Sequence, residues 1–189
     1  MAQAIVLAPR LRLVPLAPEH VEHSVRLDAD PEVMRHLTGR GRTREEAVEA
    51  HRALLALADR VPGLGVWAGF AGDEFIGRWT LEPPHRDDQG PVAGQAELGY
   101  RVRREWWRQG FASEGARALL RHGFVDLGLA RIFAETMAVN VASRRTMEAV
   151  GLRYVRTFRL DFPDPLPDSE LGEVEYAITR EEWHARQAF

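Results

Sequence analysis

The amino-acid sequence contains no cysteine and no lysine, so all 25 of its lysine-or-arginine positions are arginines. Without cysteine the chain has no thiol nucleophile, no disulfide and no Cys-ligated metal centre, and acyl transfer through a protein thioester is excluded. Without lysine it can form no Schiff base and has no Walker-type lysine for binding phosphate. Any chemistry must therefore use hydroxyl, carboxylate, imidazole, guanidinium or backbone groups.

The chain also lacks long apolar runs and a strong net charge. No stretch of about 18 apolar residues is present and the N-terminus does not resemble a signal peptide, so we expect a cytoplasmic protein without membrane contact. The net charge is −3, which gives no global attraction to nucleic acid or anionic membranes. The seven histidines include no convincing pair at metal-ligand spacing, so we expect no metal.

The sequence has enough apolar content, 45% of its 189 residues, to bury the core of one α/β domain spanning residues 1–189. A threonine and a glutamate at residues 43 and 46 form a capping box that predicts the start of a helix. Alternation along the strand at residues 97–103 puts Glu97, Gly99 and Arg101 on one side and Leu98, Tyr100 and Val102 on the other. In chain order, periodicity and turn signals predict a strand at 10–16, helices at 18–27 and from 43, strands at 65–70, 74–81 and 97–103, a helix at 113–127, a strand at 131–139, a helix at 143–150, strands at 154–160 and 173–179, and a short helix at 181–187. This order predicts an α/β (α+β) fold in which a mixed central sheet carries helices on both faces.

The most informative segment is residues 97–114, where a strand ends, a turn containing Gly110 and Ala112 follows, and an amphipathic helix begins. The N–H groups at such a helix start are unpaired, and the helix dipole favours an anion there. Small residues keep side chains from holding a phosphate away from these donors, and Arg108 and Gln109 could add side-chain donors. We interpret the turn as a pyrophosphate cradle, with an ordinary strand-to-helix turn as the alternative.

Residues 107–114, WRQGFASE, resemble the acetyl-CoA pyrophosphate loop of the GNAT acetyltransferases, and most closely the branch that contains the ribosomal-protein N-terminal (alanine/serine) acetyltransferases. The wider family has Arg or Gln where Trp107 stands, although tryptophan is common there in that branch. Residues 139–152 are similar to a second family segment, in which Asn140 ends a strand, Ser143 opens a helix and a Gly-Leu pair closes it. The likeness covers nearly the whole chain.

The resemblance implies the single-domain GNAT fold and a metal-free N-acetyltransferase that uses acetyl-CoA in a ternary complex. In the family, a backbone N–H of the strand before the pyrophosphate loop holds the oxyanion, here between Gly99 and Val102. The cofactor-binding residues that the resemblance implies are Tyr100, Arg101, Val102, Arg103, Arg108, Gln109, Gly110, Phe111, Ala112, Ser113, Asn140 and Ser143.

Two catalytic residues are candidates. Ser143 could donate a proton or hydrogen bond to the CoA sulfur, or it could simply cap its helix. Asn140 has the same ambiguity between a helix cap and a contact with the pantetheine arm. Glu97 could act as the general base, directly or through water, or it could be a solvated strand residue.

The acceptor is expected to be a primary amine. The ordinary pKa is about 7.7–8.0 for an α-amine and about 10.4 for lysine, so a weak base suits the α-amine, and our first hypothesis is the N-terminus of a protein or peptide. A polyamine or aminoglycoside acceptor, or an acyl-CoA sensor without turnover, remains open, and exposed C-terminal strands are compatible with a homodimer. We expect the acceptor pocket between the N-terminal helices, residues 40–43 and a loop at residues 161–172. That loop and the residue after it carry an acidic cluster that would attract a cationic amine: Asp161, Asp164, Asp168, Glu170 and Glu173.

Overall fold

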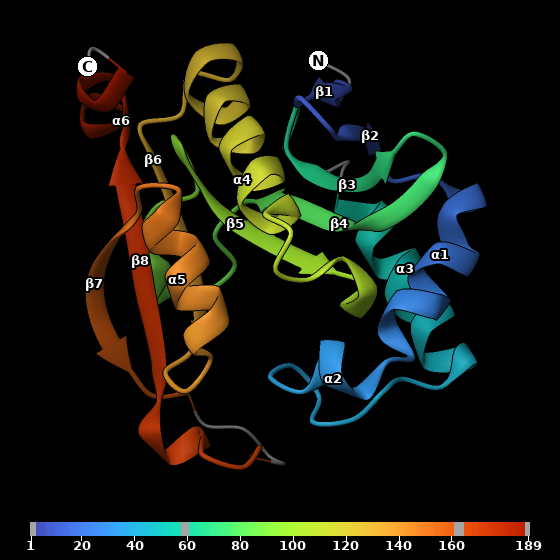
Figure 1. The fold of residues 1–189 in the computed structure, drawn as a ribbon. Helices are drawn as coiled ribbons and strands as arrows, with labels where there is room; N and C mark the ends of the chain where they lie inside the picture. Colours follow the sequence, from blue (N-terminus) through green and yellow to red (C-terminus); the bar gives the residue numbers. More distant parts are fainter. Residues whose placement is uncertain (1–2, 58–60, 161–164, 188–189) are drawn as a thin grey trace.

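The computed structural model describes residues 3–57, 61–160 and 165–187. Within these ranges eight strands form one mixed sheet in the order β1-β2-β3-β4-β5-β6-β8-β7 (Figure 1). The strands are β1 (Val6–Leu7), β2 (Arg12–Pro15), β3 (Gly65–Ala71), β4 (Glu74–Glu82), β5 (Gln95–Val102), β6 (Arg131–Met137), β7 (Arg153–Phe158) and β8 (Glu173–Thr179). The helices are α1 (Val21–Asp28), α2 (Pro31–Met34), α3 (Arg44–Leu57), α4 (Phe111–Arg121), α5 (Val141–Ala149) and α6 (Arg180–Gln187).

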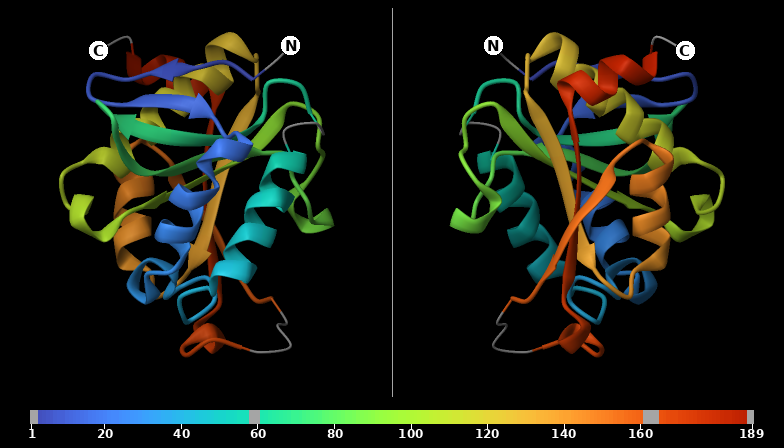
Figure 2. Two further views of the ribbon diagram at one scale, coloured as in Figure 1. Left: turned by 90° about the vertical axis from the view of Figure 1, so that its right-hand side faces the viewer. Right: turned by 90° about the vertical axis from the view of Figure 1, so that its left-hand side faces the viewer.

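Helices cover both faces of the sheet, as the sequence predicted (Figure 2). Helix α4 packs on β4 and β5 and α5 packs on β6, whereas α1 and α3 lie together on the opposite face. The alternation expected along β5 is confirmed, because Leu98 and Val102 are buried in the core beneath α4. Glu97, Gly99 and Arg101 therefore face the side of the sheet that α1 and α3 cover.

Close packing of α4 on the sheet sets the position of its N-terminus. A Cβ at Gly115 would lie 2.4 Å from Nε1 of the buried Trp79, so only glycine lets the helix approach so near. The same Trp79 Nε1 donates a hydrogen bond to the Ala112 carbonyl at 3.2 Å. The first turn of α4 is thereby anchored to β4.

Local signals in the sequence located most element ends. The capping box predicted before α3 is confirmed, because Glu46 N donates to Thr43 Oγ1 at 3.2 Å and Thr43 N donates to Glu46 Oε2 at 2.9 Å. The two-residue β1 and the four-residue α2 were not predicted, since such short elements show no periodicity. None of the described helices is long and apolar enough to cross a bilayer.

Three predicted helix ends near the site were wrong. Helix α4 begins at Phe111 and ends at Arg121, against the predicted range 113–127, and residues His122–Asp126 continue it as a π-helical turn. Helix α5 begins at Val141, two residues before the predicted start, because Asn140 caps it and accepts a hydrogen bond from Ser143 N.

Candidate active site

Strands β5 and β6 run parallel but pair over only three positions. Their register joins Gln95 to Arg131, Ala96 to Ile132 and Glu97 to Phe133, and within the described chain no pairing follows. Strand β6 stays paired with β8 along its whole length, and β5 stays paired with β4 as far as Val102. The two parallel strands therefore diverge beyond Glu97 and open a cleft that exposes one backbone edge of β5.

The turn that enters α4 has the conformation of an anion cradle. Arg108 has φ +60° and Gly110 has φ +84°, and Gly110 is the N-cap of α4. The first intrahelical bond runs from Glu114 N to Gly110 O at 2.9 Å, so the N–H groups of residues 111–113 have no acceptor within the helix. A left-handed residue next to a helix start turns successive N–H groups toward one point, where an anion binds.

Neighbouring side chains hold this cradle in place. Trp107 Nε1 donates to the Val102 carbonyl at 2.7 Å, and Gln109 Nε2 donates to the Glu105 carbonyl at 3.0 Å. Arg10, which no pattern in the sequence singles out, donates from Nη2 to the Gln109 carbonyl at 3.1 Å and forms an ion pair with Glu114 at 2.6 Å. A Cβ at Gly110 would approach Arg10 Nη2 to 3.4 Å. These free N–H donors and the absent Cβ fit a diphosphate, the group by which CoA would be held.

Ser143 lies on α5 and faces β5. Its Oγ is 3.1 Å from the hydroxyl of Tyr100, which also donates to the Ser143 carbonyl at 3.0 Å. Burial raises the pKa of Tyr100 to about 12, so the phenol stays neutral and remains a donor. The structure thus brings two of the predicted site residues together.

Asn140 takes the structural one of its two predicted roles. Its Oδ1 accepts from Ser143 N at 3.2 Å and its Nδ2 donates to Thr136 Oγ1 at 3.0 Å. Both ends of the amide are engaged, so Asn140 is the helix cap and Ser143 is not. The Ser143 hydroxyl therefore does not cap α5.

The predicted cofactor-binding residues Arg101 and Arg103 have side chains that are engaged within the protein. Arg101 pairs with Asp28 on the face away from α4. Arg103 is buried, where it donates to the Phe75 carbonyl at 2.7 Å and pairs with Glu105. A contact of either residue with CoA would therefore use its backbone groups.

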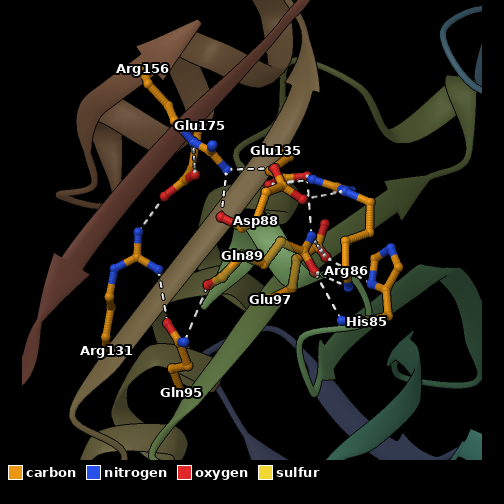
Figure 3. Close-up of polar contacts among 10 residues, drawn as sticks. All are labelled: His85, Arg86, Asp88, Gln89, Gln95, Glu97, Arg131, Glu135, Arg156 and Glu175. Carbon is orange, nitrogen blue, oxygen red and sulfur yellow. Dashed lines mark hydrogen bonds and ion pairs between the residues drawn. The ribbon is translucent and has the colours of Figure 1, made fainter. Parts of the chain in front are cut away.

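Glu97 stands at the last paired position of β5, where the cleft opens. Its Oε2 accepts a hydrogen bond from Gln89 Nε2 at 3.0 Å and lies 3.5 Å from His85 Nδ1 (Figure 3). The Glu97 side chain is 22% exposed, so it is not the freely solvated residue of the alternative interpretation. Burial, and then the nearby carboxylates of Glu135 and Glu82, raises the pKa of Glu97 to about 8.

A network of polar side chains supports Glu97 from outside the cleft. Gln89 also donates to Glu135 Oε2 at 3.2 Å, and Arg86 Nη2 donates to both oxygens of Glu135 at 2.9 and 2.7 Å. Figure 3 shows the contacts continuing through Asp88, Arg156, Glu175 and Arg131 to Gln95. Among the residues of Figure 3, Gln89 alone donates hydrogen bonds to both Glu97 and Glu135.

The side of the cleft where the sequence predicted the acceptor pocket carries acidic residues and a cavity. Burial raises the pKa of Glu82, and burial together with the nearby Glu135 raises the pKa of Glu173. Glu173 also lines a cavity of about 320 Å³, together with Thr38, Arg40, Met137, Leu166 and Ser169. The loop after α2 and the loop before β8 therefore meet there, as expected. Of the predicted acidic cluster, Asp168 and Glu170 are exposed, and Asp161 and Asp164 lie outside the described residues.

Sequence reasoning missed the residues that define the environment of Glu97. Gln89 lies in the polar loop before β5, and Glu135 lies on the neighbouring strand β6. Arg86, 49 positions before Glu135 in the sequence, donates to its carboxylate. None of the three lies in a motif with a recognisable spacing. Among the described residues no group of three His, Cys, Asp or Glu side chains could hold a metal ion.

Comparison with known proteins agrees with this geometry. Residues 10–153 match the model of the acetyltransferase (GNAT) domain. The FsC-acetyl coenzyme A-N(2)-transacetylase of Aspergillus fumigatus is 46% identical over 185 residues, which cover 96% of this chain and 79% of that relative. A putative acetyltransferase from T. thermophilus has a similar structure, with a TM-score of 0.75 and 29% identity over 97% of this chain and 93% of that one. The ribosomal L7/L12 α-N-protein acetyltransferase RimL, solved with coenzyme A, shares the fold, with a TM-score of 0.76 and 18% identity over 93% of this chain and 98% of that one.

The fold and the cradle define an enzyme that draws its acyl group from a CoA thioester. The chain belongs to the GNAT family and is an acetyl-CoA-dependent N-acetyltransferase. The family, the fold and the activity predicted from the sequence are thereby confirmed.

Proposed function

We propose that this enzyme acetylates the α-amine of a small molecule, with Glu97 as the general base. The observation that carries the proposal is the position of Glu97, buried beside two other carboxylates at the point where β5 and β6 separate. A base at this vertex faces the space in which an acetyl group and an amine would meet.

The strength of the base favours an α-amine over a lysine amine. A carboxylate with a pKa of about 8 matches the ordinary pKa of an α-ammonium, about 7.7–8.0, and falls well below the value of about 10.4 for lysine. Proton transfer from an α-ammonium to Glu97 is then nearly balanced in free energy. The neutral nitrogen forms its bond to the acetyl carbon, and the carbon–sulfur bond breaks.

The other half of the reaction needs a donor for the departing sulfur. Acetyl-CoA supplies the acetyl group when it is bound with its diphosphate on the first-turn N–H groups of α4. Ser143 is suited to protonate the sulfur, because Tyr100 orients its hydroxyl and no helix-capping bond occupies it. An N–H on the exposed edge of β5 would stabilise the oxyanion.

A small molecule is favoured over a protein N-terminus by the relative that is 46% identical. Its name places the acetyl group on a nitrogen numbered 2, the number that amino-acid nomenclature gives to an α-amine. The cavity of about 320 Å³ beside Glu173 is of the size that encloses a small ligand. The protein N-terminus remains the competing acceptor in the test.

Two isomers of one compound provide the test. Nε-acetyl-lysine has a free α-amine, Nα-acetyl-lysine has a free ε-amine, and a lysine-free heptapeptide represents a protein N-terminus. Both isomers are used as their C-terminal carboxamides, so that the α-amine has the peptide-like pKa of about 7.7–8.0. We expect CoA release with the Nε-acetyl isomer to exceed that with the Nα-acetyl isomer at neutral pH by at least about a hundredfold, which follows from the ratio of their neutral fractions. Equal release from the two isomers would contradict the α-amine, a preference for the heptapeptide would contradict the small molecule, and tight acetyl-CoA binding without any release would indicate a sensor.

A further inference from the structure

A buried cluster of charged residues lies on the acceptor face of the sheet, apart from the residues around Glu97. Asp28, at the end of α1, is fully buried and contacts three guanidinium groups. Arg42 Nη1 lies 2.9 Å from Asp28 Oδ2, Arg78 Nη2 lies 3.5 Å from Oδ1, and Arg101 also pairs with Oδ1. One carboxylate thus faces three arginines, and three positive charges against one negative charge give the cluster a formal charge of +2.

This positive charge is incompletely compensated. Arg78 is 5% exposed, and its Nη1 has no hydrogen-bond partner among the residues that the structure describes. Burial, and then the neighbouring Arg101, lowers the pKa of Arg78 to about 10. Glu82, further along the same face of β4, forms no ion pair with any described arginine. A buried guanidinium with one nitrogen left unpaired is costly, so an anion that reached this cluster would be bound strongly.

The cluster is partly exposed and held in place. The side chains of Arg42 and Arg101 are 26% and 17% exposed, so an anion can reach them without unfolding the protein. Arg42 N donates to the Asp28 carbonyl at 2.8 Å, which fixes the loop between α2 and α3 on the end of α1. Thr38 and Arg40 of that same loop line the acceptor cavity.

Strand register places the cluster in line with the general base. On β4 and β5 Arg78 pairs with Arg101, Thr80 with Gly99, and Glu82 with Glu97. All six residues face one side of the sheet, and the arginine and glutamate pairs are four residues apart, about 13 Å along the strands. Only a threonine and a glycine stand between the two pairs. An acceptor near Gly99 would therefore have carboxylates at one end and guanidinium groups at the other.

We propose that Arg42, Arg78 and Arg101, organised by Asp28, bind a carboxylate of the acceptor, so that the substrate is a zwitterion with its ammonium at Glu97 and its carboxylate at the arginine cluster. This inference rests on the proposed α-amine acceptor and names its chemical class, an amino acid or short peptide-like acid. Guanidinium groups suit a carboxylate because their planar donors match its two oxygens.

The first test compares acids with their amides on the unmodified enzyme. Amino acids and dipeptides are offered beside the same compounds with the terminal carboxylate converted to an amide. We expect KM for the acids to be at least about tenfold lower, because a charge-assisted hydrogen bond is lost in the amides, while kcat changes little. Equal KM values for acid and amide would overturn the carboxylate site, although acetyl transfer to both would leave the proposed function intact.

Matched arginine variants locate the effect. Arg42→Gln removes a donor at the edge of the cluster, whereas Arg44→Gln removes an exposed arginine two residues later that pairs with Glu22. We expect Arg42→Gln to raise KM for the acids by about tenfold and to leave KM for the amides and for acetyl-CoA unchanged. Arg44→Gln should alter none of these constants. An equal rise for acid and amide acceptors would contradict the proposal.

A binding measurement separates this inference from the proposed function. Malonate, at an ionic strength matched with chloride, should raise the Tm of the unmodified protein and of Arg44→Gln, because a ligand that binds only the folded state stabilises it. The rise should be lost in Arg42→Gln. A rise of equal size in all three proteins would overturn the arginine site even if no acceptor amine were found.

Discussion

The hydroxyl oxygen of Tyr100 lies 3.1 Å from Oγ of Ser143 and joins β5 to α5 across the cleft. These two elements lie on either side of the space that a thioester would enter between β5 and β6. The single proton of the phenol is donated to the Ser143 carbonyl at 3.0 Å, so the contact with Oγ positions the serine hydroxyl at the cleft, where its own proton can turn from the phenol oxygen to a departing sulfur.

Ser143→Ala should therefore slow turnover much more than it weakens CoA binding. We expect kcat to fall by about 10²-fold, the lower range for loss of a general acid, while the Kd for CoA changes less than threefold. Tyr100→Phe should produce a smaller loss of kcat, and Tyr154→Phe, an exposed tyrosine on β7, should have no effect. Unchanged turnover in Ser143→Ala would remove this serine from the mechanism.

The raised pKa of Glu97 predicts the pH dependence of activity. Because the ionised form is the proposed base, kcat/KM for a weakly basic acceptor amine that stays neutral across the pH range should rise with pH and level off above about pH 8, the pKa that burial and the neighbouring carboxylates produce. Glu97→Gln should lower kcat/KM by about 10²–10⁴-fold and abolish this rise. Glu49→Gln on the exposed side of α3 provides the control. A profile of the same shape in Glu97→Gln would assign the base elsewhere.

The same pKa has a consequence for stability. Between the ordinary glutamate value of about 4.3 in the unfolded chain and about 8 in the folded one, the folded state binds more protons at Glu97, so the contribution of this group to stability falls as pH rises through that range. The change in Tm caused by Glu97→Gln should be more positive at pH 9 than at pH 5, by several degrees, because only at pH 9 does the substitution remove a buried charge. Thermal unfolding of both proteins at the two pH values measures this difference, and an equal effect at both would contradict burial of the charge.

Gly110 should be required for CoA binding. Alanine at φ +84° is strained, and its Cβ would enter the cradle beside Arg10. Gly128→Ala is the matched control, because Gly128 has φ +67° and open space around it, so backbone strain is similar but no site is touched. We expect Gly110→Ala to raise the Kd for CoA at least about tenfold through lost donors to the diphosphate. A similar loss in Gly128→Ala would attribute the effect to stability.

Gln89 should change the pKa of Glu97, the proposed base, without contacting the substrate. Its hydrogen bond favours the ionised form of Glu97 and so lowers the pKa of that carboxyl, against the larger effect of burial. Gln89→Met removes the donor, so the rise of kcat/KM should move to higher pH, while the plateau at high pH is nearly retained. Gln187→Met on the exposed α6 should leave the profile unchanged. An unmoved profile in Gln89→Met would show that the contact does not affect the base.

Local patterns were sufficient for most of the longer elements and for the conformation of the predicted cofactor loop. The capping box before α3, the alternation along β5 and the glycine turn before α4 depend on residues a few positions apart, so they can be recognised in one dimension. The end of α4 could not be located in this way, because the π-helical turn at His122–Asp126 continues the same apolar spacing.

The sequence by itself determined the fold family, the acetyl donor and the strand that carries Glu97, the proposed base. Only the tertiary structure decided what surrounds that base, because Glu97 meets Gln89 from a loop and Glu135 from another strand. It alone brought Arg101 to Asp28 across 73 positions and Arg10 to Glu114 across 104. Charges act through distance and burial, and neither quantity exists for a pair of residues until the sheet and its helices have assembled.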